Sequence, residues 1–114
     1  MNGTMNAMLK SALVALGLFA MLALASAGEG FAQDGKAVFT QKGCPACHGP
    51  DGKTTLMPVY PKLAGQNADY LVAQLLAFKT QQRKSGQSAL MWGMAAQLND
   101  AEIKAVSVWL SKVK

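Results

Sequence analysis

Both cysteines of this 114-residue chain and its one histidine lie within five consecutive residues, Cys44 to His48. A domain of this size buries only a small core and usually needs a cross-link or a bound group to hold it together. A disulfide between Cys44 and Cys47 would close too short a loop to restrict the unfolded chain much. This pentapeptide, Cys-Pro-Ala-Cys-His, must therefore contribute something other than a structural disulfide.

The N-terminal segment has the layout of a secretory signal peptide. Residues 11–27 form an uncharged apolar run that follows Lys10 and ends in small residues. The pattern predicts export to a periplasm, with cleavage after Ala27 or, at a second small-residue site, after Ala32. We therefore expect a signal peptide followed by one domain over 28–114. The run is at the lower edge of the length that spans a bilayer, so an uncleaved anchor is the alternative interpretation.

The charge of the exported part is mildly positive. Removing the leader takes away Lys10 alone and leaves ten basic and six acidic side chains. These charges are spread along the chain, which argues against nucleic-acid binding. A modest positive charge suits transient docking to acidic protein surfaces.

Helices are predicted over 34–42, over 67–80 and from Asn99 towards the C-terminus. Each begins with an Asp or Asn, whose side chain can accept a hydrogen bond from the first turn of a helix. Glu102, three residues after Asn99, completes a capping-box pattern. These caps and the apolar stripes that follow them predict three to four helices.

The segments between these helices are predicted to be irregular. Residues 49–65 are rich in proline and glycine, 81–87 are polar, and 88–98 are expected to form a second long loop. We find no strand pattern, so the fold class is all-α. Loops this long in so small a domain are expected to wrap a ligand.

The spacing of the pentapeptide identifies that ligand. Cys-x-x-Cys-His is the attachment signature for c-type haem: two thiols can add to the two vinyl groups of the porphyrin, and the next imidazole reaches the iron. We predict one covalently bound haem c, attached at Cys44 and Cys47, with His48 on the iron. A redox disulfide would need alternating strands and helices, and a zinc site would need a fourth ligand that no other Cys or His supplies.

If the haem is a plain electron carrier, a methionine is the remaining candidate for the second axial ligand, because the chain has no other histidine. A His/Met pair is the usual ligation of electron-carrying cytochromes c. Beyond the leader the candidates are Met57, Met91 and Met94. Met57 lies soon after His48, in the loop expected to stay on that side of the haem. Met91 and Met94 lie far enough along the chain to reach the opposite face.

Several segments resemble class I cytochromes c. They are Cys44 to Gly52 (CPACHGPDG), Pro61 to Gln66 (PKLAGQ), Tyr70-Leu71, Gln74-Leu75, Phe78-Lys79, and Met91 to Leu98 running into Asn99-Asp100. The resemblance covers nearly all of the chain after the leader. It is strongest to small one-haem bacterial cytochromes and to each half of their two-haem periplasmic relatives. It implies a small cytochrome c fold wrapped around one covalent haem.

The resemblance also implies which methionine binds the iron. In the family, the segment corresponding to MWGMAAQL uses its first methionine as the axial ligand. This points to Met91, with Met94 as a packing residue.

Two further contacts are implied by the same resemblance. Gly35 and Phe39 resemble first-helix residues that contact an aromatic side chain of the last helix, here Trp109. Pro58 resembles the proline whose backbone carbonyl accepts the ring N–H of the haem-ligating histidine, here His48.

The implied function is reversible one-electron transfer by a carrier that is not an enzyme. Electrons are expected to pass through the haem edge near Cys47 to transient redox partners with acidic docking surfaces, and the protein is expected to be a monomer that contacts a membrane only if the leader is retained. The residues expected to ring that edge, unless they are simply a solvated face, are Lys42, Lys53, Lys62, Lys79, Arg83 and Lys84. The alternatives are a haem subunit of a larger dehydrogenase or oxidase, and a haem protein with an open sixth position.

Overall fold

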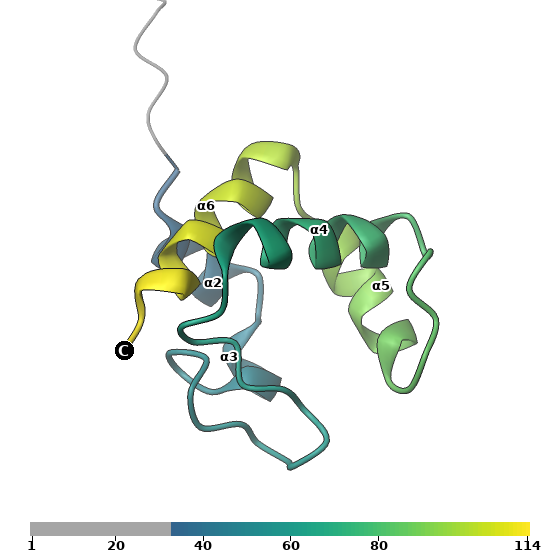
Figure 1. Cartoon of the computed structure of the whole chain (residues 1–114), viewed down its shortest axis with the longest axis horizontal. Coiled ribbons are helices and arrows are strands. Elements are labelled where there is room, and N and C mark those ends of the chain that lie inside the picture. Colours follow the sequence, from purple (N-terminus) through teal and green to yellow (C-terminus); the bar gives the residue numbers. More distant parts are fainter. Residues whose placement is uncertain (1–32) are drawn as a thin grey trace, which may run out of the picture. The chain divides into compact units, whose positions relative to one another are not determined.

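The computed structural model describes residues 33–114. The predicted signal peptide and both of its possible cleavage sites lie outside this range. The described part is helical, without strands, which confirms the all-α class. Its helices are α2 (Gly35–Gln41), α3 (Pro45–His48), α4 (Ala68–Lys79), α5 (Ser88–Ala96) and α6 (Asp100–Lys112) (Figure 1). Among these residues, no helix has the length and apolar character that a membrane crossing requires.

The predicted caps are all present. The Asp34 carboxylate accepts from the backbone N–H of Lys36 at 3.0 Å, and the Asn67 side chain accepts from Tyr70 N–H at 3.0 Å. At the start of α6, Asn99 accepts from Glu102 N–H at 2.8 Å, and Glu102 accepts from Asn99 N–H at 3.1 Å. These reciprocal bonds form the capping box that the sequence predicts.

One predicted loop was wrong. Residues 88–98 were expected to be irregular, whereas Ser88–Ala96 form helix α5. The described part therefore contains five helices, one of them a single turn, where three to four were predicted. Packing explains the difference, because Ala95 and the following Leu98 are buried. Residues 49–65 contain no helix or strand, as predicted.

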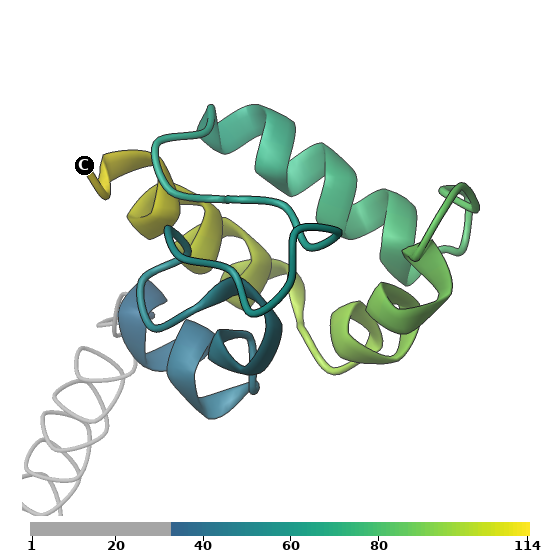
Figure 2. The same cartoon turned by 90° about the horizontal axis from the view of Figure 1, so that it is seen from below.

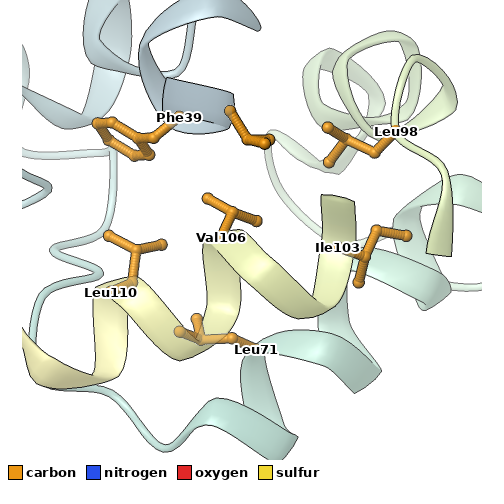
Figure 3. Packing of buried hydrophobic residues seen from close by; sticks show 7 residues of the cluster. Phe39, Leu71, Leu98, Ile103, Val106 and Leu110 are labelled. Atoms are coloured by element: carbon orange, nitrogen blue, oxygen red, sulfur yellow. The ribbon is translucent and has the colours of Figure 1, made fainter. Parts of the chain in front are cut away.

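The core lies where α2 and α4 pack on α6 (Figures 2 and 3). It is a cluster of buried apolar side chains: Val38, Phe39, Leu71, Leu98, Ile103, Val106 and Leu110. Three of these, Ile103, Val106 and Leu110, form an apolar stripe along α6. Burying such a stripe is the main source of stability for a helix of this length.

The predicted contact between the first and last helices is confirmed. The rings of Phe39 and Trp109 lie 5.2 Å apart between centroids, tilted by 48°. At Gly35, an added Cβ would lie 2.2 Å from the Ala105 carbonyl oxygen and 2.5 Å from Trp109 Cβ. Helices α2 and α6 thus cross at a point that only glycine allows.

Candidate haem site

The pentapeptide forms the single helical turn of α3. Pro45 is its first residue, where its missing N–H and its fixed φ suit a helix start. The His48 N–H donates to the Cys44 carbonyl at 3.1 Å, and the Cys47 N–H donates to the same oxygen at 3.3 Å. Residues three and four apart in a helical turn lie on one side of it. The turn therefore brings Cys44, Cys47 and His48 to the same side.

A close backbone contact ends this turn. Gly49 has φ +82°, and an added Cβ there would lie 2.0 Å from the carbonyl oxygen of Thr54. The chain must therefore fold back directly after His48, and only glycine permits the approach. This fold places the loop over 49–65 beside the pentapeptide.

His48 is buried and its ring is held in one orientation. Its Nδ1 lies 2.8 Å from the Pro61 carbonyl oxygen. Because a carbonyl can only accept, Nδ1 carries a proton, which leaves the lone pair of the neutral imidazole on Nε2. Nε2 has no hydrogen-bond partner in residues 33–114. It is not fully buried either, because the one fully buried side-chain nitrogen or oxygen without a partner in this range is Ser107 Oγ. The imidazole thus presents a nitrogen that is free to bind a metal ion.

The predicted acceptor for this ring was wrong. The partner of His48 is Pro61, not Pro58, which is exposed in the loop. The Gly52 carbonyl accepts from Leu63 N–H at 2.9 Å and from Ala64 N–H at 3.2 Å, which turns the chain so that Pro61 faces the imidazole. Pro61 begins the PKLAGQ segment, but nothing in the local sequence marked it rather than Pro58 as the acceptor.

The two thiols are free and half-buried. Burial raises the pKa of the Cys44 thiol above its ordinary value, and the nearby Cys47 adds to the shift, while a backbone hydrogen bond opposes it. Burial disfavours the thiolate, so Cys44 stays protonated at neutral pH. Within residues 33–114, no three His, Cys, Asp or Glu side chains gather to hold a metal ion.

Helix α5 carries both candidate sulfur ligands. Met91 and Met94 are three residues apart in it and half-buried, whereas Met57 is 45% exposed in the loop after His48. Both views place α3 and α5 apart (Figures 1 and 2). Met94 reaches back towards the pentapeptide, since its methyl group would lie 3.6 Å from a Cβ added at Gly43. Met91 as the axial ligand stays a prediction.

The six basic residues expected at the docking surface fall into two groups. Lys42 donates to the Gln97 carbonyl at 3.3 Å and lies 3.5 Å from Glu102. Lys79 donates to the Leu98 carbonyl, and the Arg83 guanidinium donates to Gln74 at 2.8 Å. These three cations thus have internal partners. The exposed remainder is Lys53, Lys62 and Lys84.

The residues at this site fit a haem. The described part presents two free thiols, one free imidazole nitrogen and a helix with two thioethers. It also exposes several large apolar side chains: Leu56, Met57, Val59, Tyr70, Leu76 and Leu90. A large apolar group bound near the pentapeptide would cover part of that surface.

Comparison with known proteins decides the family. The model of the family described as cytochrome c matches residues 32–114. The chain belongs to the cytochrome c family. Membership of this family brings one covalently bound haem c, for which Cys44, Cys47 and His48 have the required spacing. This confirms the predicted cofactor and the resemblance to class I cytochromes c.

The chain is similar in sequence to several bacterial cytochromes. Cytochrome c-554(548) of Halomonas halodenitrificans is 46% identical over 68 residues, which are 60% of this chain and 81% of that protein. Cytochrome c4 of Stutzerimonas stutzeri is 36% identical over 89 residues, 77% of this chain and 42% of that protein. A protein of the same species named thiosulfate dehydrogenase electron acceptor is 41% identical over 70 residues, 61% of this chain and 32% of that protein.

A solved structure supports the cytochrome c fold. The crystal structure of reduced recombinant cytochrome c4 from Pseudomonas stutzeri matches with a TM-score of 0.63 and 32% identity. The match covers 73% of this chain and 48% of that one. This cytochrome therefore spans less than half the length of the cytochromes c4 it resembles.

Proposed function

We propose that this cytochrome is a periplasmic electron carrier that cycles one haem c between ferric and ferrous iron with His/Met ligation, and that it has no enzymatic activity. The observation that carries the proposal is the His48 ring, whose Nδ1 is occupied by Pro61 and whose Nε2 is left free beside two thiols. A haem protein that fills both axial positions from its own chain has no place for substrate at the iron.

Each residue has a defined part in this proposal. Cys44 and Cys47 would hold the haem through two thioether bonds, and His48 would bind the iron through Nε2. The carbonyl of Pro61 fixes the tautomer and orientation of His48 and increases the basicity of its ring. The bound haem supplies a one-electron couple, and the protein keeps the same ligands in both states.

Met91 is the proposed second axial ligand. It lies on α5, a different element from the His48 turn, and it is half-buried. The Met94 methyl group is directed towards Gly43, where an added Cβ would lie 3.6 Å from it, and this orientation supports Met94 as a packing residue. Met57 lies exposed in the loop that follows His48, which disfavours it as a ligand.

The docking surface is proposed to surround Cys47. The Leu56 N–H donates to the Cys47 carbonyl at 3.0 Å, and the Leu56 side chain is 71% exposed. Lys53 and Lys62 lie exposed in the same loop. An apolar contact with a basic rim suits short-lived complexes with acidic partners. The relatives named as electron acceptors of thiosulfate dehydrogenase support an oxidoreductase as the electron donor.

Export completes the proposal. The leader over 1–27 is proposed to direct the chain to the periplasm and to be removed, which leaves 28–114 as a soluble monomer. A pyridine haemochrome assay with intact mass on the exported protein reports the covalent haem, its number and the cleavage site together. A bare polypeptide mass would overturn the assignment.

The ligand assignment is tested with a matched pair of variants, Met91→Ala and Met94→Ala. The oxidised parent protein is expected to have the far-red sulfur-to-iron charge-transfer band. Met91→Ala should lose that band and bind carbon monoxide when reduced, whereas Met94→Ala should keep it. The reverse pattern would identify Met94 as the iron ligand. A parent protein that lacks the band and binds carbon monoxide would favour an open sixth position.

A further inference from the structure

We infer that the Trp92 indole and the Arg83 main chain form a clamp that positions Met91 for the iron. The inference rests on the proposed function, because it concerns how the chain holds the proposed sulfur ligand. Trp92 is the neighbour of Met91 in α5, and its Nε1 donates to the Arg83 carbonyl at 2.8 Å. Successive helical residues differ by about 100° around the axis, so fixing Trp92 fixes the direction of Met91.

Helix α5 has little intrinsic stability. It has nine residues, and its N-cap Gln87 makes no side-chain capping bond. It also contains Gly93, the least favourable helical residue after proline. Helices of this length are marginal unless other parts of the protein hold them. The position of α5 must therefore depend on its external contacts.

The first of these contacts is the hydrogen bond from Trp92 to the Arg83 carbonyl, and Arg83 is itself held in place. The Arg83 N–H donates to the Ala77 carbonyl at 3.1 Å, and the Arg83 guanidinium donates to Gln74 at 2.8 Å. The same guanidinium lies 4.6 Å from the centre of the Phe78 ring. These three contacts attach Arg83 to α4. The indole bond therefore ties α5 to α4.

The second set of contacts lies at the C-terminal end of α5. Lys42, the residue after α2, and Lys79 from α4 donate to the carbonyls of Gln97 and Leu98, which directly follow the helix. Cations are favourable at a helix C-terminus, where carbonyls lack intrahelical partners. With the middle of α5 held by Trp92 and its C-terminal end by the two lysines, rotation of α5 about its axis requires breaking the Trp92 bond. The clamp thus determines where the Met91 sulfur points.

The experiment measures how often the sixth position opens. Exogenous imidazole binds ferric iron only when methionine has left it, so its apparent affinity scales with the open fraction. Trp92→Phe keeps the apolar ring and removes the one donor. A single hydrogen bond of ordinary strength predicts an increase of about five-fold in imidazole affinity. Arg83→Ala, which frees the loop from Gln74 and Phe78, should act in the same direction.

The matched control is Trp109→Phe. Trp109 packs on Phe39 between α2 and α6, and its indole makes no hydrogen bond within residues 33–114. The control should lower the free energy of unfolding and leave imidazole affinity at the parent value. Equal effects of the two tryptophan variants, or an unchanged affinity in Trp92→Phe, would overturn the clamp. A parent protein that lacks the far-red band would instead refute the proposed methionine ligation itself.

Discussion

Gly35 stands where helices α2 and α6 come closest, and its lack of a side chain allows the contact. A methyl group there would lie 2.2 Å from the Ala105 carbonyl oxygen, well inside van der Waals contact. Gly93 is the opposite case, an exposed helical glycine with nothing within 4 Å of an added Cβ. The same substitution should therefore have opposite effects at these two positions.

We predict that Gly35→Ala destabilises the haem-loaded protein by about 1–3 kcal/mol, because α2 must move away from α6. Gly93→Ala should stabilise it by about 0.5–1 kcal/mol through helix propensity. Guanidinium unfolding followed by far-UV circular dichroism measures both. Parent-like stability of Gly35→Ala would contradict the close crossing of the two helices.

At the scale of elements, α6 and α5 are stabilised in different ways. Helix α6 has a capping box at its start and a stripe of buried residues along its length. Helix α5 lacks a capping side chain and is held by bonds from other elements. Helix α6 thus contains its own start signal, whereas α5 depends on the tertiary structure around it.

The capping box gives a test at this scale. Asn99→Ala removes the acceptor for the Glu102 N–H and should lower the free energy of unfolding by about 1 kcal/mol. Asn99→Asp keeps an acceptor in the same place and should stay close to the parent protein. Thermal unfolding of the three proteins under identical conditions provides the comparison, and equal losses in both variants would count against the cap.

At the scale of the whole molecule, the core of the described part is small. It consists of seven buried apolar side chains around α6, while large apolar residues elsewhere remain exposed. A domain with so little buried area is marginal by itself. The covalent haem is therefore expected to be part of the folded structure as well as its redox centre.

The variant Cys44→Ala with Cys47→Ala tests this dependence. It should be isolated without covalent haem, with weak near-UV circular dichroism and without a cooperative thermal transition, because the apolar surface near α3 loses its largest partner. Met94→Ala, which keeps the attachment, serves as the control for a local packing defect. A cooperative transition in the double variant equal to that of the parent would contradict the expectation.

The net charge of the molecule gives a second test at this scale. Electron-transfer rates with an acidic partner should fall by roughly tenfold from low to physiological ionic strength. Lys53→Gln with Lys62→Gln should flatten this dependence in stopped-flow measurements. The matched control is Lys36→Gln with Lys104→Gln, which removes the same charge from α2 and α6. An equal effect of both pairs would place the docking surface elsewhere.

The sequence by itself determined the features that depend on residues close together in the chain. The pentapeptide, the caps of α2, α4 and α6, and the all-α class follow from spacings of a few residues, because a capping side chain and the N–H it binds lie in the same turn. The haem attachment residues Cys44, Cys47 and His48 were predictable for the same reason. They lie within residues 32–114, which the cytochrome c family model matches.

Only the tertiary structure decided the features that join distant segments. The acceptor for His48 is Pro61 because the Gly52 carbonyl turns the loop, and no local pattern distinguished it from Pro58. Residues 88–96 are rich in the helix formers Ala, Leu and Met but lack a capping side chain, and the end of this helix is held by hydrogen bonds from Lys42 and Lys79. In the sequence, Lys42 and Lys79 could not be distinguished from solvent-exposed lysines. Their hydrogen bonds to backbone carbonyls are seen only in the folded structure. Such contacts arise from packing between elements, which local spacing does not specify.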